Sequence, residues 1–388
     1  MAELRFNPKV NPSKPMRLLL ASLLTATSAA LPAQQFDTRG IPADAAIVVL
    51  TAPSTGLQIN NSPEMKALRE RMEKLSAKAS KGAVQPNYEK ILQEELGFNT
   101  NDTNNAFAVG VNVAMGANGQ PAFSGAAILH VKIDPKKVEA FAKKRGVAAL
   151  TAGGKSGWNA MQFVAAIVDP KGQTTADEES FQIGLFVIDA STVAIVQPKD
   201  AAACFASLAG KAPSYALNPA QKAFAAETGK AYGFFAVNMA RLPSTPELEQ
   251  AGLANAMMAF GEKGPNQVYQ IAANFTSAEK AKTTGQQIQG FLAAAPLLLA
   301  IDPAEPVEQQ ALKKMGGEIV SAIQPVKVEG TRASLVVSME TSKLIGMVSQ
   351  MFDLAEKQLD TQAGAPATNP TVKAAGGKKK PVAPATSK

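Results

Sequence analysis

The hydrophobic pattern of the chain centres on one stretch, residues 181–208, that predicts two strands followed by a helix. Residues 181–188 and 192–196 are apolar, β-branched runs on either side of an Asp-Ala-Ser turn, and residues 199–209 have helical character. A looser copy of the pattern occupies residues 325–352. Two copies of one strand-strand-helix pattern favour a chain built from two similar halves.

The remaining periodicity predicts further strands and helices in both halves. The other predicted strands are 45–52, 106–115, 122–133, 158–168, 232–240, 267–275, 325–329 and 333–339. Predicted helices begin at the capping residues Ser62, Asp134, Asn218, Thr245, Ser277 and Asp302, with two more at 87–96 and 342–359. Asn218 and Gln221 have the spacing of a capping box.

The order of these elements is shared between the halves. Helix starts correspond at offsets of 143 (Asp134 and Ser277) and 142 (Asp200 and Ser342), with about 40 extra residues in the first half. We therefore predict an α+β fold of two similar tandem halves, each a mainly antiparallel sheet with helices packed on one face. The predicted organisation is a signal peptide (1–33), a first half (34–209), a linker (210–217), a second half (218–360) and a disordered tail (361–388).

The N-terminus has the pattern of an export signal. Lys14 and Arg17 precede the apolar run 18–24, and small residues lead to Ala33, with Met16 as an alternative start. The run is too short to cross a bilayer, so no transmembrane segment is expected in the mature chain. The sequence thus predicts a periplasmic or extracellular protein.

The positive charge of the chain lies at its two ends. Of the net charge of +7, residues 1–33 carry +3 and residues 361–388 carry +5, which leaves −1 for the body. A near-neutral body lacks the basic surface of a nucleic-acid-binding domain, so no nucleic acid partner is expected. The tail is rich in Lys, Pro and Ala and cannot form a core, although Lys378–Lys380 could touch an anionic surface.

The residues that could carry chemistry form no recognisable constellation. Cys204 and His130 are the only residues of their types, which excludes an intramolecular disulfide and a pair of histidine metal ligands. The segment 152–157 (AGGKSG) lacks the first glycine of a phosphate loop, and the acidic run 177–179 lacks calcium-loop spacing. The sequence therefore predicts no catalytic, cofactor-binding or metal-ligating residue and leans against an enzyme, and it resembles no family closely enough to transfer a function.

Two apolar features bear on function. Residues 290–301 (GFLAAAPLLLAI) are uncharged, and we expect them to form a buried helix end or the wall of a hydrophobic cleft. The last helix has an apolar stripe that we expect to be core, formed by Leu344, Met347, Val348, Met351 and Leu354. The favoured function is an exported, non-catalytic interaction or envelope-associated protein. The alternatives are a periplasmic carrier of a hydrophobic or lipid ligand, and a hydrolase with dispersed carboxylates; the partner is accordingly a protein or a hydrophobic small molecule.

Overall fold

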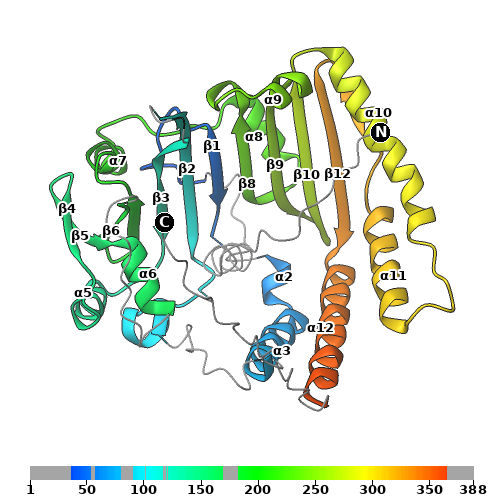
Figure 1. Ribbon diagram of the computed structural model, residues 1–388, viewed down its shortest axis with the longest axis horizontal. Coiled ribbons are helices and arrows are strands. Elements are labelled where there is room, and N and C mark those ends of the chain that lie inside the picture. Colours follow the sequence, from blue (N-terminus) through cyan, green and yellow to red (C-terminus); the bar gives the residue numbers. More distant parts are fainter. Residues whose placement is uncertain are drawn as a thin grey trace, which may run out of the picture.

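The computed structural model describes residues 36–53, 57–79, 91–100, 102–116, 119, 121–168 and 182–364, which form the predicted α+β fold on one large antiparallel sheet (Figure 1). The strand order is β11-β12-β10-β9-β8-β1-β2-β3-β7-β6-β5-β4. The strands are β1 (Ile47–Thr51), β2 (Ala106–Met115), β3 (Pro121–His130), β4 (Ala149–Ala152), β5 (Lys155–Asn159), β6 (Gly184–Asp189), β7 (Thr192–Val196), β8 (Lys230–Asn238), β9 (Leu253–Lys263), β10 (Asn266–Phe275), β11 (Lys327–Glu329) and β12 (Arg332–Glu340).

The helices connect these strands and cover parts of the sheet. They are α2 (Gln58–Asn61), α3 (Pro63–Ala79), the π-helical turn η1 (Ile91–Glu95), α5 (Pro135–Lys144), α6 (Ala160–Val168), α7 (Ala201–Leu208), α8 (Pro219–Ala226), the 3-10 turn η2 (Met239–Arg241), α9 (Pro246–Ala251), α10 (Ala278–Leu298), α11 (Val307–Ser321) and α12 (Thr341–Gly364). Side-chain caps fix several of their starts. The predicted capping box of α8 is confirmed, with the Gln221 amide N–H donating to Asn218 Oδ1 and the Asn218 amide N–H donating to Gln221 Oε1, both at 2.9 Å.

Strands β1 and β8 form an antiparallel pair near the middle of the sheet. Outward from this pair the order is β2-β3-β7-β6-β5-β4 on one side and β9-β10-β12-β11 on the other. Helices α5 and α10 follow β3 and β10, and α7 and α12 follow β7 and β12. This shared order favours the two tandem halves, which remain a prediction together with their boundaries.

Helices cover both faces of the sheet around β6 and β7, whereas the sequence predicted one covered face. Adjacent residues on a strand point to opposite faces. Phe186 and Ala194 belong to a core formed with α7 and α8, while their neighbours Leu185 and Val193 belong to a second core formed with α5 and α6. The predicted strand 158–168 is the reason for the difference, because most of it folds as α6 instead.

The misassigned segment is apolar except for Asn159 and Gln162, so it has no alternation that could separate a strand from a helix. The structure places Ala160, Phe163 and Ala166 on the buried side of α6 at helical spacing. The side chain of Asn159 accepts a hydrogen bond from the Gln162 amide at 3.0 Å and starts the helix.

Two strand features were absent from the sequence prediction. The helix that starts after Thr245 ends at Gly252, which has a φ of 61°, and β9 follows at once between β8 and β10. Its alanine, asparagine and methionine residues have weak strand propensity, and pairing on both sides compensates for this. In the segment 152–157, Gly153 and Gly154 form the turn of the β4–β5 hairpin, and the other residues belong to its two strands.

Helices α3, α11 and α12 lie beyond one end of the strands, at the bottom of the view in Figure 1. Arg71 on α3 binds two carboxylates of α12, with its Nη2 atom 2.5 Å from Asp353 Oδ1 and 2.6 Å from Glu356 Oε2. Helix α12 extends to Gly364, four residues into the segment predicted as a disordered tail. The predicted signal and the rest of the tail lie outside the described residues.

Candidate functional site

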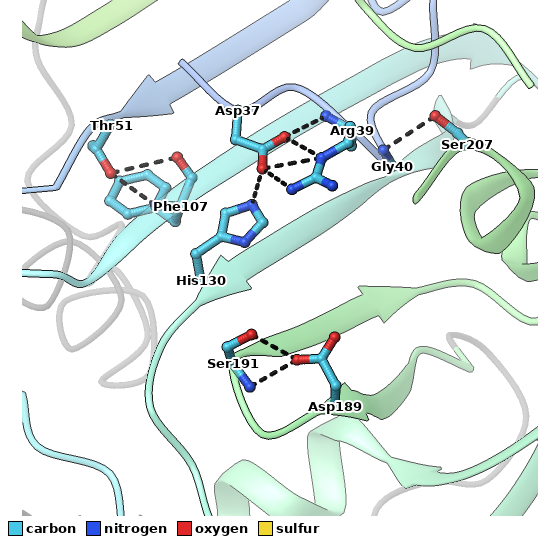
Figure 2. A network of polar contacts seen from close by, with 9 residues as sticks. All are labelled: Asp37, Arg39, Gly40, Thr51, Phe107, His130, Asp189, Ser191 and Ser207. Atoms are coloured by element: carbon cyan, nitrogen blue, oxygen red, sulfur yellow. Dashed lines mark hydrogen bonds and ion pairs between the residues drawn. The ribbon is translucent and has the colours of Figure 1, made fainter. Parts of the chain in front are cut away.

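The single histidine lies in a polar network at the end of β3 (Figure 2). His130 Nε2 is 3.5 Å from Asp37 Oδ2, and the Arg39 guanidinium binds the same carboxylate, with Nε 3.0 Å from Oδ1 and Nη2 2.5 Å from Oδ2. Burial raises the pKa of Asp37, but the hydrogen bonds from Arg39 lower it by more than burial raises it. The pKa of Asp37 therefore lies below its usual value. The network joins the segment before β1 to β3.

Among the residues that the structure describes, no serine completes a Ser-His-Asp arrangement with His130 and Asp37. Ser191 directs its hydroxyl and its amide N–H to Asp189 Oδ1, both at 2.7 Å, and Figure 2 shows this pair turned away from the imidazole. Burial lowers the pKa of His130 and outweighs the attraction of Asp37. The imidazole is therefore neutral near pH 7 and has a structural position at the sheet.

The buried histidine should make stability depend on pH. The pKa of His130 is lower in the folded than in the unfolded chain, because burial outweighs Asp37 and Asp189, while Arg39 adds to the lowering. The unfolded state therefore binds the proton first as the pH falls through about 6.5. We expect the free energy of unfolding to fall between pH 7.5 and pH 5.5, and this fall to be smaller in His130→Gln, measured by urea unfolding at both pH values. A wild-type chain that is equally stable at both would contradict the prediction.

The other sequence candidates lie apart from this network. Cys204 is buried on α7, and burial first, then Asp200, raises the pKa of its thiol to about 12, so the sulfur is protonated at neutral pH. The Lys155 ammonium of the segment 152–157 lies over the Phe205 ring, 5.8 Å from its centroid. The acidic run 177–179 lies outside the described residues. In the part of the chain that the structure describes, no three His, Cys, Asp or Glu side chains gather as a metal site.

Exposed apolar side chains gather on α10, α11 and the segment between them. Of the sixteen large hydrophobic side chains that the described residues expose, eight lie between positions 288 and 319. They are Ile288, Phe291, Leu297, Leu298, Ile301, Val307, Leu312 and Ile319. We call residues 288–319 the apolar hairpin; it lies at the right of Figure 1, beside the sheet edge formed by β11 and β12.

The sequence predicts a buried helix end or the wall of a hydrophobic cleft for residues 290–301, and the structure corrects the buried helix end. Leu297 is 80% exposed, and Phe291 and Leu298 are 65% and 67% exposed, while Ala295 is buried. The last turns of α10 are apolar on all sides, so packing one side against the protein leaves the others in water. The signal for this exposed apolar surface was the run of twelve uncharged residues, 290–301. An ordinary surface helix has one apolar face and therefore far fewer apolar positions.

Specific contacts hold the apolar hairpin in its shape. Gly316 on α11 lets Leu299 approach closely, since a Cβ atom at position 316 would lie 2.9 Å from Leu299 Cδ2. The Lys313 ammonium donates to the Ala300 carbonyl at 2.9 Å and to Glu305 Oε1 at 2.5 Å. These bonds close the segment between the helices, so the exposed side chains are presented on an ordered support.

The apolar stripe of the last helix is mainly core, as predicted. Met347 is buried and packs with Met315 and Met339, and Leu344 and Leu354 lie against this cluster. Met351 is 55% exposed. The cluster fixes α11 and α12 to β12, so the apolar hairpin is joined to the sheet through a packed base.

A pocket of about 300 Å³ lies at the other end of the central strands, where the chain between α7 and α8 passes over β1, β8 and β9. Tyr215, Asn238, Arg241 and Asn255 contribute to its wall. No pattern in the sequence indicates this pocket, because these residues come from separate elements that only the fold brings together.

Comparison with known proteins adds no functional assignment. Among the described residues, none of the helices is long and apolar enough to span a bilayer. No family model matches the chain, and no curated protein matches it. The chain is similar to three crystal structures of TP0453. Crystal form III matches over 81% of this chain and 99% of its own at 9% identity, and crystal form I over 82% and 99% at 9% identity. Crystal form IV matches over 81% and 97% at 10% identity. Their TM-scores are 0.35, 0.34 and 0.34, too low to carry a functional argument.

Proposed function

We propose that this chain is an exported, non-catalytic protein of the cell envelope that binds a membrane surface through the apolar hairpin. The observation that carries the proposal is the exposure of Phe291, Leu297, Leu298 and Val307, each 65% to 80% accessible on one rigid element. Contiguous exposed apolar surface on a soluble body marks a site of interaction with a membrane or another protein.

A lipid surface fits the composition of the apolar hairpin. Helix ends that are apolar on all sides are found in protein cores or in lipid. The uncharged run 290–301 is shorter than the roughly twenty residues of a membrane-spanning helix. A short apolar element of this kind enters the boundary between headgroups and acyl chains without crossing the bilayer.

The basic tail supplies a second attraction to the same surface. It follows α12 and carries five lysines and no acidic residue between positions 361 and 388. A lysine close to an anionic bilayer contributes on the order of 1 kcal/mol. Stable membrane binding generally needs two such signals, and an apolar element with a basic segment is one of the common pairs.

The two alternative functions receive less support. The carrier hypothesis predicts an apolar cavity of several hundred cubic ångströms, whereas the pocket of about 300 Å³ at α8 has several amide groups and one charged group, Arg241, in its wall. The hydrolase hypothesis predicts a cleft with two carboxylates, and no residue lining that pocket is an aspartate or a glutamate.

The proposal is tested by flotation of the protein with vesicles. The test variant is Phe291→Ser, Leu297→Ser, Leu298→Ser, and the vesicles are phosphatidylcholine alone or with one third phosphatidylglycerol. Each of the three side chains should contribute about 1–2 kcal/mol on entering lipid. We therefore expect the triple variant to bind both vesicles at least roughly tenfold more weakly than the wild-type chain.

Two controls distinguish binding by the apolar hairpin from binding by other exposed apolar side chains and from attraction by the charged tail. Met115→Ser, Phe123→Ser, Met161→Ser removes three exposed apolar side chains elsewhere and should leave binding unchanged. Replacing Lys378–Lys380 with Gln should weaken binding only to the anionic vesicles. A wild-type chain that binds neither vesicle, or a triple variant that binds as well as the wild type, would overturn the proposal and direct attention to a protein partner.

A further inference from the structure

The pocket over β1, β8 and β9 has the features of a small-molecule site remote from the apolar hairpin. Its volume is about 300 Å³. Seven alanines, with Val48, Val237 and Met257, form the apolar part of its wall, and seven residues with polar side chains complete it. These are Tyr215, Asn218, Gln221, Asn238, Arg241, Asn255 and Asn274. A mostly apolar wall with a few convergent polar groups is the usual composition of a ligand pocket.

The polar side chains of the pocket leave more hydrogen-bond donors than acceptors available to a ligand. Asn238 Oδ1 accepts from the Ala240 amide at 3.1 Å, and Asn255 Oδ1 accepts from Asn274 Nδ2 at 2.5 Å. The Nδ2 atoms of Asn238 and Asn255 thus keep their hydrogens for another partner. Tyr215 accepts from Gln221 Nε2 at 2.9 Å, which leaves its own O–H to donate.

The pocket wall carries one positive charge, that of the Arg241 guanidinium. Arg241 lies in the wall, and within the described residues it forms no ion pair. No aspartate or glutamate lines the pocket. Burial raises the pKa of Tyr215, and the nearby Arg241 lowers it only in part, so the phenol keeps its proton at neutral pH.

We propose that this pocket binds a small monocarboxylic acid, with its carboxylate held by Arg241 and Tyr215 and its compact apolar body against the alanine wall. An arginine with neutral donors beside it suits a planar carboxylate, which takes two parallel N–H bonds. One guanidinium balances one negative charge, which favours a monoanion over a phosphate dianion. The volume is at the small end of the range for ligand pockets, so the apolar body has to be short.

Isothermal titration of the full chain with matched acids and amides tests this proposal. The probes are acetate, butyrate, hexanoate and benzoate, each compared with its primary amide, which has the same shape without the charge. Loss of a charge-assisted pair typically weakens binding by a factor of about ten or more. We expect at least one acid to bind, and its amide to bind at least roughly tenfold more weakly.

Variants assign the binding to the pocket. Arg241→Gln should weaken the acid by about tenfold or more, and Tyr215→Phe by roughly three- to tenfold. Lys222→Gln, on the exposed side of α8, should have no effect. The proposal is overturned if no acid binds up to about 10 mM, if acid and amide bind equally, or if Arg241→Gln binds like the wild type. Because the variants leave residues 288–319 intact, the result is independent of the membrane proposal.

Discussion

Replacing Phe186 with alanine should lower the free energy of unfolding by about 3–5 kcal/mol. Phe186 is fully buried on β6, and its ring meets the ring of Phe205 edge to face, with centroids 5.1 Å apart. The ring fills a slot that two glycines create. A Cβ atom at Gly157 would lie 2.6 Å from the ring, and one at Gly184 would lie 2.3 Å from it.

In Phe186→Ala, the neighbouring residues cannot move to fill the space that the ring leaves. Neither glycine has a side chain to move into it, and both belong to paired strands. The cavity term therefore adds to the lost transfer free energy, which places the expected loss in the upper part of the usual range. Urea unfolding followed by the fluorescence of Trp158, the single tryptophan, measures this loss in the half of the sheet where it occurs.

The matched control is Phe123→Ala. Phe123 is 42% exposed on β3, so its loss should lower the free energy of unfolding by less than about 1 kcal/mol. Equal losses for the two variants would show that Phe186 is not the packing centre that the structure indicates.

The sequence predicts the fold well where two independent signals agree. For the α5 helix, the Asp134 cap, the proline after it and the apolar spacing all indicate a helix start, and the helix begins there. For the strand pair β11 and β12, apolar runs flank Gly330 and Thr331, and the hairpin forms at those residues. Where hydrophobicity was the single signal, as in residues 158–168, the prediction was wrong because a run with only two polar residues has no clear period.

The candidate surfaces were harder to predict because exposure is a property of the assembled fold. An apolar run such as 290–301 is compatible with a core or with a surface, and only the position of α10 beside the edge of the sheet decides between them. The pocket depends on residues 20 or more positions apart, such as Tyr215 and Asn238, whose proximity follows from the pairing of β1 with β8. Neither pairing register nor helix position can be read from local spacing.

Replacing Gly125 with alanine should lower the free energy of unfolding by more than about 3 kcal/mol. Gly125 lies in β3 with a φ of 143°, a conformation that side chains rarely adopt. A Cβ atom there would lie 2.1 Å from the Gly110 carbonyl oxygen and 2.9 Å from Val111 Cα, both in the backbone of β2. Backbone atoms of a paired strand cannot move aside as a flexible side chain could, so the strain has to separate the two strands.

The position of Gly125 in the sheet explains why this conformation is used. Pairing between β3 and β7 begins at Ala126, so Gly125 is the first residue of β3 beyond that ladder. Its amide N–H donates to Asp200 Oδ2 at 3.4 Å, at the start of α7. The bend at Gly125 therefore lets the N-terminal end of α7 satisfy a backbone donor on the side away from β2, where β7 no longer pairs with β3.

Gly317→Ala provides the comparison that isolates this effect. Gly317 lies in α11, where a Cβ atom would meet nothing within 4 Å, so alanine should stabilise the chain by roughly 0.5–1 kcal/mol. A Gly125→Ala chain that unfolds at the same urea concentration as the wild type would contradict the prediction. If that chain instead fails to fold on expression while Gly317→Ala folds normally, the result locates the requirement in the contact between β2 and β3, because the two substitutions add the same methyl group.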